Sequence, residues 1–490
     1  MSLLGLDVGL TGCRALVTAT DGTLLVDIGR GYDPPADLDA CELDVRSIWA
    51  AAAAVLREAA QRTVADPIAG LAVSSVGEAF VPLARDGSVL SGCLLPSVPG
   101  DDDIVSQLVA QLGQDKIYDI TGQVSGRAHT ITRLCSLRRG LPELYRSTWR
   151  FALVGSLVAH LLGANTTCDY SLAGGTLCFD MRQKTWSREI LATCGLSSIK
   201  LPILAEAATP IGVISSRVAH ELGLSPRLTI VLGGHDLTCH ALGVGAISHG
   251  MAVLNLGASV HMTPVFHAIP LISMMLREGL SVEYHVVPNL LLADSYVRAG
   301  GSWLRWFSSE IAPLEQRETA RRGLSLYKVL LDEMPAEPSP LLVRPPQDLN
   351  PTRAGSIQGL TLDTTRGELI KGMLEGIALQ NALVQRRLEA NGVGIDLYRA
   401  TGGGSRTDSW VSLCADVLGK PVERTTTQQS AALGAAILAG VGIGAYDDLA
   451  EGAEALVRIE RVFEPDIASH RIYEERLQAL DLSGGAFVTA

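Results

Sequence analysis

Two similar strand–turn–strand units with glycine in the turn limit what this chain can fold into. The first spans Ser2–Ala19, and Asp21-Gly22 then supplies a hairpin turn before Leu24–Ile28. The second spans Ala252–Val265, with Gly257-Ala258-Ser259 at its turn. At 490 residues the chain is also too long for one ordinary core. These features predict two related halves, residues 1–246 and residues 247–490.

The segments between these units alternate between strand and helix patterns. Ile48–Thr63 is rich in alanine with apolar residues at helical spacing, and Ile68–Ser74 is a short apolar run that suits a buried central strand. Arg366–Glu389 predicts a long helix with one apolar face, and Ile395–Thr401 predicts a strand before three glycines. The alternation indicates an α/β architecture with a mixed sheet.

Charge and cysteine usage exclude several classes of protein. The net charge of −12 argues against a nucleic-acid partner, because phosphate binding over a large surface needs a basic face. None of the nine cysteines has CxxC spacing, which indicates reduced thiols rather than a zinc or redox site. The N-terminus lacks a signal-peptide pattern, so a cytoplasmic protein is expected. Phe151–Ala164 and Ala431–Tyr446 are too short or too glycine-rich for membrane spans and predict buried helices.

Three short segments could carry chemistry. In Gly5–Arg14 the glycines would let backbone amides approach a phosphate, while Asp7 could hold Mg²⁺ through water; an ordinary hairpin is the alternative. In Gly233–Asp236 a carboxylate ends an apolar run and could act as a general base, a metal ligand or only a helix N-cap. Thr401–Asp408 places three glycines before a helix, which suits a phosphate, a flat ligand or simply a tight turn.

Two further polar groups have simpler interpretations. His235 and His240 are five residues apart, which is the wrong spacing for two metal ligands on one helical face, and no HExxH motif accompanies them. Both are therefore predicted not to bind metal. Asp101-Asp102-Asp103 follows Pro99-Gly100 and predicts a solvated loop.

Taken in order, these segments resemble the FGGY family of carbohydrate kinases over roughly residues 3–460. Gly5–Arg14 is similar to that family's first phosphate motif, and Gly233–Asp236 is similar to its catalytic segment. The remaining similar segments are the second phosphate motif, two segments around the adenosine, the C-terminal signature and a shared helix: Leu256–Ser259, Gly301–Trp306, Gly402–Trp410, Gly355–Glu375 and Ala432–Leu438.

The resemblance implies two ribonuclease H-like domains of the actin-like ATPase class around a central cleft, with the sugar on residues 1–246 and ATP-Mg²⁺ on residues 247–490. It implies Asp236 as the catalytic base, with Asp7 and Asp236 near Mg²⁺. It places the substrate at Gly77, Glu78, His235 and Asp236. The nucleotide would contact Thr11, Gly12, Arg14, Gly257, Ala258, Gly301, Arg305, Gly403, Gly404 and Thr407.

The chain departs from the family pattern where hydroxyls or charges are usual. Leu10 and Gly12 stand where the first phosphate motif has hydroxyl side chains, and Ala258 stands where the second has threonine. Pro96–Gly100 replaces a common Trp-x-Asp-x-Arg segment, and Gln429 replaces an acidic residue. Gly372 stands where the C-terminal signature usually has alanine or serine. Each lost hydroxyl–phosphate contact costs about 1 kcal/mol, which would weaken nucleotide binding and leave the base in place.

The expected function is ATP-dependent phosphorylation of a small sugar or polyol, with a ketopentose such as xylulose as the first candidate. The alternative is a non-catalytic or weakly active protein that senses sugar or nucleotide with the same cleft. Neither a membrane nor a nucleic acid is expected as a partner, and the oligomeric state stays open, a homodimer included. The two halves are expected to close on their ligands, with Gly233-Gly234 and residues 243–250 as flexible backbone near the boundary.

Overall fold

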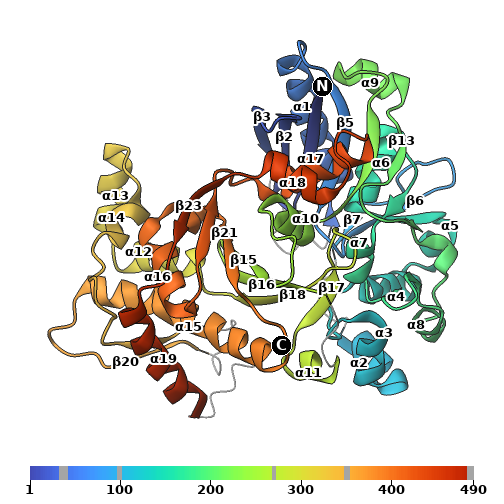
Figure 1. The fold of residues 1–490 in the computed structure, drawn as a ribbon. Coiled ribbons are helices and arrows are strands. Elements are labelled where there is room, and N and C mark those ends of the chain that lie inside the picture. Colours follow the sequence, from blue (N-terminus) through green and yellow to red (C-terminus); the bar gives the residue numbers. More distant parts are fainter. Residues whose placement is uncertain (33–41, 96–101, 268–271, 347–353, 483–490) are drawn as a thin grey trace.

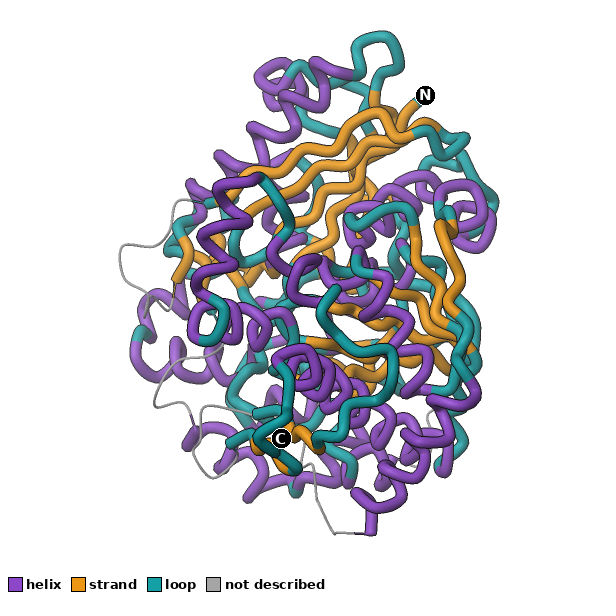
Figure 2. The backbone as a smooth tube through the Cα atoms, turned by 90° about the vertical axis from the view of Figure 1, so that its left-hand side faces the viewer, coloured by secondary structure: helices purple, strands orange, loops and turns teal. Residues whose placement is uncertain are grey.

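The computed structural model describes residues 1–32, 42–95, 102–267, 272–346 and 354–482. It contains two large mixed sheets, seen as two separate groups of strands in Figure 2. The N-terminal sheet has the strand order β13 (Pro210–Val213), β14 (Thr229–His235), β5 (Ile68–Ser75), β1 (Ser2–Val8), β2 (Gly12–Ala19) and β3 (Leu24–Gly31). The C-terminal sheet has the order β17 (Ser281–Tyr284), β18 (Leu291–Val297), β16 (Val260–Phe266), β15 (Met251–Leu256), β21 (Leu397–Thr401), β22 (Val422–Thr425) and β23 (Ile459–Phe463).

The two sheets repeat one plan. β1, β2 and β3 form an antiparallel run, as do β15, β16 and β18. β1, β5 and β14 are parallel, as are β15, β21 and β22. Antiparallel β13 and β23 then close the corresponding edges. The two related halves predicted from the glycine turns are therefore present.

Helices and small sheets cover the two large sheets. The helices are α1 (Val45–Arg62), α2 (Asp102–Leu112), α3 (Gln114–Thr121), α4 (Thr130–Gly140), α5 (Pro142–Ser147), α6 (Val154–Leu162), α7 (Tyr170–Gly174), α8 (Arg188–Thr193), α9 (Ser216–Leu222), α10 (Asp236–Gly243), α11 (Ile272–Arg277), α12 (Gly301–Glu310), α13 (Pro313–Arg322), α14 (Leu326–Leu331), α15 (Arg366–Ala390), α16 (Asp408–Leu418), α17 (Ser430–Gly442), α18 (Leu449–Leu456) and α19 (Ile467–Leu482). The short strands are β4 (Glu42–Leu43), β6 (Phe80–Leu83), β7 (Cys93–Leu94), β8 (Arg150–Leu153), β9 (Thr167–Cys168), β10 (Phe179–Asp180), β11 (Thr185–Trp186), β12 (Ile203–Leu204), β19 (Leu342–Arg344) and β20 (Ser356–Gln358).

The central strands β1, β5 and β14 of the N-terminal sheet are buried on both faces, which explains their nearly continuous apolar sequences. Leu4 and Leu6 of β1 join a core shared with α1, while Leu3 joins a different core shared with α17. Side chains alternate between faces along a strand, so neighbouring residues serve different cores. Gly5 is needed because a Cβ there would lie 1.7 Å from the carbonyl oxygen of Ala432 in α17.

Two helices are exchanged between the halves. α17 follows β22 of the C-terminal sheet but packs on the N-terminal strands, and Figure 1 shows α17 and α18 beside them. α10 follows β14 of the N-terminal sheet, and its Ala241 packs with Val253 of β15. The helices cross closely: a Cβ on Gly243 would lie 1.8 Å from the Ser430 carbonyl oxygen, and one on Gly434 would lie 2.0 Å from that of Cys239. This crossing fastens the two halves together.

Most predicted elements are confirmed with small shifts at their ends. The helices predicted at Ile48–Thr63 and Arg366–Glu389 are α1 and α15, and both apolar stretches contain buried helices, α6 and α17. None of the described helices is long and apolar enough to cross a membrane. The loop predicted at residues 101–103 is wrong in part, because α2 begins at Asp102. Acidic residues stabilise a helix N-terminus, so an acidic run can also begin a helix.

Candidate active site

The carboxyl ends of three parallel strands meet at one edge of the N-terminal sheet. In register, Asp7 of β1 lies beside Ser74 of β5, and Ser74 lies beside Gly234 of β14. Glu78 follows β5 closely, and Asp236 follows β14 directly. Ligands of α/β proteins bind at such strand ends. The sheet thus brings together three acids that are far apart in the sequence.

Asp7 is a half-buried carboxyl that lies near a second carboxyl, that of Asp236. The Ser74 hydroxyl donates a hydrogen bond to Asp7 Oδ1 at 2.9 Å. Burial, and then the nearby charge of Asp236, raise the pKa of Asp7 to about 7. A cation near both carboxylates would relieve this repulsion, which is consistent with the predicted metal role.

Asp236 is the first residue of α10 but does not cap it. The N-cap residue is His235, which makes no side-chain capping bond. Asp236 Oδ1 instead lies 3.2 Å from His235 Nε2, and its side chain is 36% exposed. The N-cap interpretation of Asp236 is therefore wrong, and its partly exposed carboxylate remains available to a ligand.

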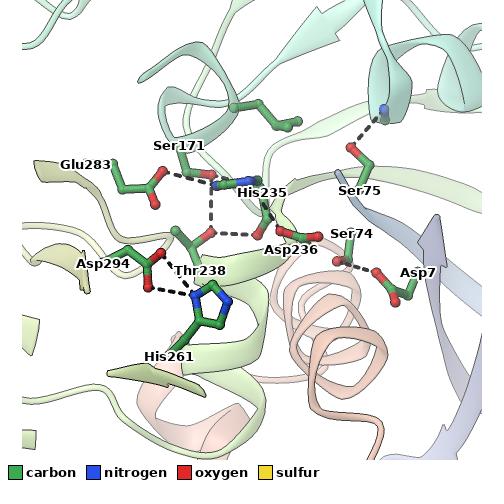
Figure 3. Close-up of polar contacts among 12 residues, drawn as sticks. Asp7, Ser74, Ser75, Ser171, His235, Asp236, Thr238, His261, Glu283 and Asp294 are labelled. Atoms are coloured by element: carbon green, nitrogen blue, oxygen red, sulfur yellow. Dashed lines mark hydrogen bonds and ion pairs between the residues drawn. The ribbon is translucent and has the colours of Figure 1, made fainter. Parts of the chain in front are cut away.

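His235 links Asp236 to a second carboxylate, as Figure 3 shows. Its Nδ1 lies 3.1 Å from Glu283 Oε2, on β17 of the C-terminal sheet. Burial alone would lower the pKa of His235, but Glu283, Asp236 and Glu78 together raise it well above its ordinary value. Glu283, His235 and Asp236 thus form a continuous chain from one half to the other.

Glu78 completes this group of acids beside His235. Burial raises its pKa to about 7, with a lowering by His235 and a further raising by Glu283 and Asp236. Its backbone is left-handed, with φ of 59°, which costs energy for a residue with a side chain. A Cβ on Gly175 would lie 2.4 Å from Glu78 Oε1, and one on Gly77 would lie 3.0 Å from His235 Nε2. The carboxyl and imidazole are therefore packed against glycine backbone.

The backbone ahead of Asp236 is fixed by buried hydroxyls. The His235 amide donates to Ser171 Oγ at 2.9 Å, and the Thr238 hydroxyl donates to the His235 carbonyl oxygen at 2.9 Å. The Ser171 hydroxyl in turn donates to Asp169 at 2.6 Å, and Asp169 also caps α7. These bonds hold the strand-to-helix turn that presents Asp236.

A cavity of about 260 Å³ lies on the C-terminal half, beyond the ends of β15 and β21. Its floor is a turn joined to α12: the Gly301 amide donates to the Gly257 carbonyl oxygen at 2.9 Å, and the Ser302 amide donates to that of Ala258 at 3.0 Å. Seven of the ten residues predicted to contact the nucleotide line this cavity: Gly257, Ala258, Gly301, Arg305, Gly403, Gly404 and Thr407.

The other three belong to the first hairpin, apart from this cavity. Thr11 is exposed at the β1–β2 turn, and Arg14 makes an ion pair with Asp27 at 2.5 Å. A Cβ on Gly12 would lie 2.4 Å from the carbonyl oxygen of Arg30, so the close approach of β3 explains why no hydroxyl residue stands there. The altered segment Pro96–Gly100 lies outside the described residues.

The thiols and histidines elsewhere in the described ranges form no cluster of metal ligands. The eight cysteines within the described ranges are free, and no group of three His, Cys, Asp or Glu side chains there is arranged to hold a metal. His240 Nδ1 lies 2.6 Å from Ser430 Oγ, at the crossing of α10 and α17.

Sequence reasoning missed Glu283, Ser171 and Asp169. Glu283 lies 48 residues from His235 and Ser171 lies 64 residues before it, so no local spacing connects them. Of the three, only Asp169 has a local signal, because Asp is a favoured helix N-cap residue.

A pair of related α/β halves, with acids at the strand ends of one and a glycine-walled cavity on the other, defines a phosphotransferase of the actin-like ATPase fold. The chain belongs to the FGGY family of carbohydrate kinases: the family's N-terminal domain matches residues 2–243, and its C-terminal domain matches residues 275–443. It is therefore an ATP-using carbohydrate kinase that phosphorylates a sugar hydroxyl.

Similar proteins are kinases of several small substrates. The autoinducer-2 kinase of Escherichia coli (strain K12) is 27% identical over 96% of this chain and 92% of its own length, and that of Klebsiella pneumoniae is 27% identical over 97% and 92%. Among solved structures, xylulose kinase from Rhodospirillum rubrum superposes with a TM-score of 0.88 at 24% identity, covering 99% of this chain and 98% of that one. Gluconate kinase from Lactobacillus acidophilus gives 0.86 at 21%, covering 100% and 98%.

Proposed function

We propose that this kinase transfers the γ-phosphoryl group of ATP to a hydroxyl of a neutral, polyhydroxylated small molecule, with Asp236 as the general base. The observation that carries the proposal is the Glu283–His235–Asp236 chain beside Glu78. In this proposal residues 1–246 supply the sugar side of the cleft, and residues 247–490 supply the nucleotide side.

For the transfer of a substrate proton to Asp236, the protein groups required are His235 and Asp236, which are already in contact. His235 holds Asp236 through Oδ1, so Oδ2 is the oxygen that can accept the proton of a substrate hydroxyl. As that proton leaves, the hydroxyl oxygen bonds to the γ-phosphorus and the bond to the ADP oxygen breaks. Phosphoryl transfer depends chiefly on positioning and charge stabilisation, which suits a site with a single base.

Asp7 and Asp236 are the residues proposed to hold Mg²⁺. Mg²⁺ commonly uses one or two carboxylates and completes its octahedron with water and phosphate oxygens, so two carboxylates without a third protein ligand fit it. Desolvation and the charge of Asp236 raise the pKa of Asp7, Arg14 lowers it in part, and a cation between the two carboxylates would lower it further, which supports this proposal. When bound, Mg²⁺ supplies charge neutralisation on the phosphoryl oxygens.

The nucleotide is proposed to occupy the cavity on the C-terminal half. Its glycine-lined walls, at Gly257, Gly301, Gly403 and Gly404, let the backbone approach a flat ring or a phosphate closely. The N-terminus of α12 lies at the same turn and favours negative charge. Thr11, Gly12 and Arg14 would approach the phosphates from the N-terminal hairpin when the cleft closes.

The charge of the sugar side limits the substrate. Three carboxyl groups, those of Glu78, Asp236 and Glu283, surround the imidazole of His235, and a fourth, that of Asp7, lies near Asp236. A carboxylate or phosphate on the substrate would be repelled, whereas hydroxyls would donate to these acids. A neutral ketopentose such as xylulose fits this requirement better than a sugar acid such as gluconate. Autoinducer-2 is the second candidate, because the similar curated kinases are named for it.

A substrate panel tests the proposal. ADP release would be measured with xylulose, autoinducer-2, glycerol and gluconate at equal concentrations. We expect turnover with a neutral substrate and little with gluconate. A preference for gluconate would contradict the charge argument. Tight binding of a sugar and ATP without turnover would favour the sensing protein over the kinase.

A further inference from the structure

One β-hairpin carries two carboxylate–histidine pairs, one on each side of the cleft. β17 and β18 pair antiparallel. Glu283 of β17 lies 3.1 Å from His235 Nδ1, and both oxygens of Asp294 on β18 lie 3.1 Å from His261 Nδ1. Figure 3 shows both pairs, with each carboxylate beside the Nδ1 atom of its histidine. The base chain described above uses only the first pair.

The second pair ends on the hydroxyl of Ser259, the residue that follows Gly257 and Ala258 of the nucleotide cavity's lining. His261 Nε2 lies 2.9 Å from Ser259 Oγ, and Ser259 belongs to the glycine turn that lines this cavity. The ring of His261 also stacks on Tyr296, with centroids 5.6 Å apart, and Thr263 donates to Asp294 at 3.4 Å. The ring is therefore held from its Nδ1 edge and its face, and its Nε2 is aimed at Ser259.

The hairpin is fastened to both halves of the molecule. β18 pairs with β16 in the C-terminal sheet. On the other side, the Val282 amide donates to the Gly122 carbonyl oxygen at 2.7 Å, and the Tyr284 hydroxyl donates to that of Met181 at 2.6 Å. A shift of one half against the other would therefore move both carboxylates.

We propose that the β17–β18 hairpin is a positioning element whose two carboxylates, Glu283 and Asp294, act through histidines on the sugar side and the nucleotide side of the cleft. This inference rests on the proposed function. On the nucleotide side Asp294 orients His261, His261 orients the Ser259 hydroxyl, and that hydroxyl donates to a phosphoryl oxygen of the nucleotide. Glu283 acts through His235 on the base.

The hydrogen-bond roles on the nucleotide side are consistent. Burial alone would lower the pKa of His261, but the charge and hydrogen bond of Asp294, and then the charge of Asp236, raise it overall. In the proposed arrangement the ring carries a proton on both nitrogens. Nδ1–H then donates to Asp294, and Nε2–H donates to Ser259 Oγ. The Ser259 proton is left for the ligand. This arrangement gives the second glycine turn a fixed hydroxyl although Ala258 offers none.

The two carboxylates provide controls for one another. We expect Asp294→Asn to weaken ADP affinity, measured by calorimetry without sugar, about tenfold, which corresponds to one hydrogen bond to a charged group. We expect Glu283→Gln to leave ADP affinity unchanged and to lower kcat. Equal ADP affinity in Asp294→Asn and the wild type would overturn the nucleotide-side role, and an unchanged kcat in Glu283→Gln would overturn the sugar-side role.

A double-mutant cycle tests whether Asp294 acts through Ser259. In a Ser259→Ala background, Asp294→Asn should cost no further ADP affinity, because the hydroxyl it positions is gone. Additive losses would contradict the positioning role. If Asp294→Asn does not fold, Ser259→Ala alone decides, since ADP affinity equal to that of the wild type would overturn the proposal. Phosphoserine at residue 259 after incubation with ATP would also overturn it, because Ser259 would then be an acceptor.

The same titrations separate this inference from the proposed function. A wild-type protein that binds no ADP would overturn both. A wild-type protein that binds ADP and phosphorylates a sugar, with neither carboxylate variant affected, would overturn the positioning element alone.

Discussion

On the sugar side, Glu78 carries its carboxyl group on left-handed backbone near His235. Its backbone is left-handed, its side chain lies against Gly175, and the Thr130 hydroxyl donates to its carbonyl oxygen at 2.7 Å. Burial raises its pKa from an ordinary 4.5 to about 7. Strained backbone of this kind is kept where the surrounding structure requires it, and here it directs a carboxyl group toward His235.

Glu78→Gln should remove a pH dependence of stability. Between pH 4.5 and pH 7 the folded wild type binds more protons at this site than the unfolded chain, so its free energy of unfolding falls as pH rises. The full change is about 3 kcal/mol. The neutral amide does not titrate, so the variant's stability relative to the wild type should rise by that amount over this range and then level off.

Urea unfolding at several pH values measures this difference. Glu143→Gln on exposed α5 is the control and should show no such trend, because that side chain is largely in solvent. A constant difference between Glu78→Gln and the wild type from pH 4.5 to pH 8 would contradict the burial of a titrating carboxyl at residue 78.

At the scale of elements, adding a hydroxyl to the turn at residues 257–259 tests whether this turn contacts a phosphate of the nucleotide. Ala258 is exposed beside the nucleotide cavity, and its carbonyl oxygen accepts bonds from Ser302 that fix the turn. Ala258→Thr should tighten ADP binding about fivefold, equivalent to about 1 kcal/mol, by adding a hydroxyl donor. Ala258→Val has the same shape without the hydroxyl and should not. Equal affinities of the two variants would show that this turn does not reach a phosphate.

The crossing of α10 and α17 tests the packing of elements. Gly243→Ala should destabilise the fold by about 3 kcal/mol or more, because its Cβ would lie 1.8 Å from a backbone oxygen that cannot move alone. Gly140→Ala, in α4 with no atom within 4 Å of the added carbon, is the matched control and should be tolerated. Thermal unfolding would compare them. Equal melting temperatures would contradict the close crossing.

The elements show which features a sequence can predict. Apolar runs and glycine turns predicted β1, β2, β5, β15, β16, α1 and α15, because burial on a face and turn geometry depend on nearby residues. The same reasoning interpreted Gly5 as part of a phosphate turn, whereas the structure also requires it for contact with α17, more than 400 residues away. The exchange of α10 and α17 has no local signal, because neither helix's own sequence identifies the half onto which it packs, and α17 is apolar and buried on all sides.

In the candidate active site too, residues with a local signal could be predicted from the sequence, and residues brought in by long-range contacts could not. Asp7 and Asp236 could be proposed because each stands next to a glycine or an apolar strand end, whereas Glu78 was proposed only from the family resemblance. Glu283 and Asp294 could not, because their roles arise from the register of a distant hairpin against His235 and His261. The glycines expected to supply flexibility are another case: Gly233 and Gly243 lie against backbone of Val73 and Ser430, so close packing already accounts for them.

At the scale of the whole molecule, the two halves should approach each other on ligand binding. The acids lie on one half and the nucleotide cavity on the other, so transfer requires the cleft to close and exclude water. The radius of gyration from small-angle scattering should fall when a substrate sugar and a non-hydrolysable ATP analogue bind together. An unchanged radius with both ligands bound would favour a rigid sensing protein.

The role of Asp236 is the central claim, and phosphoryl transfer by Asp236→Asn tests it most directly. The variant should keep its affinity for sugar and ADP, since the amide preserves shape, while ADP release with the preferred sugar falls by about 10² to 10⁴-fold. Asp103→Asn, on the exposed first turn of α2, is the control and should match the wild type. A folded Asp236→Asn protein that turns over at nearly the wild-type rate would contradict this account.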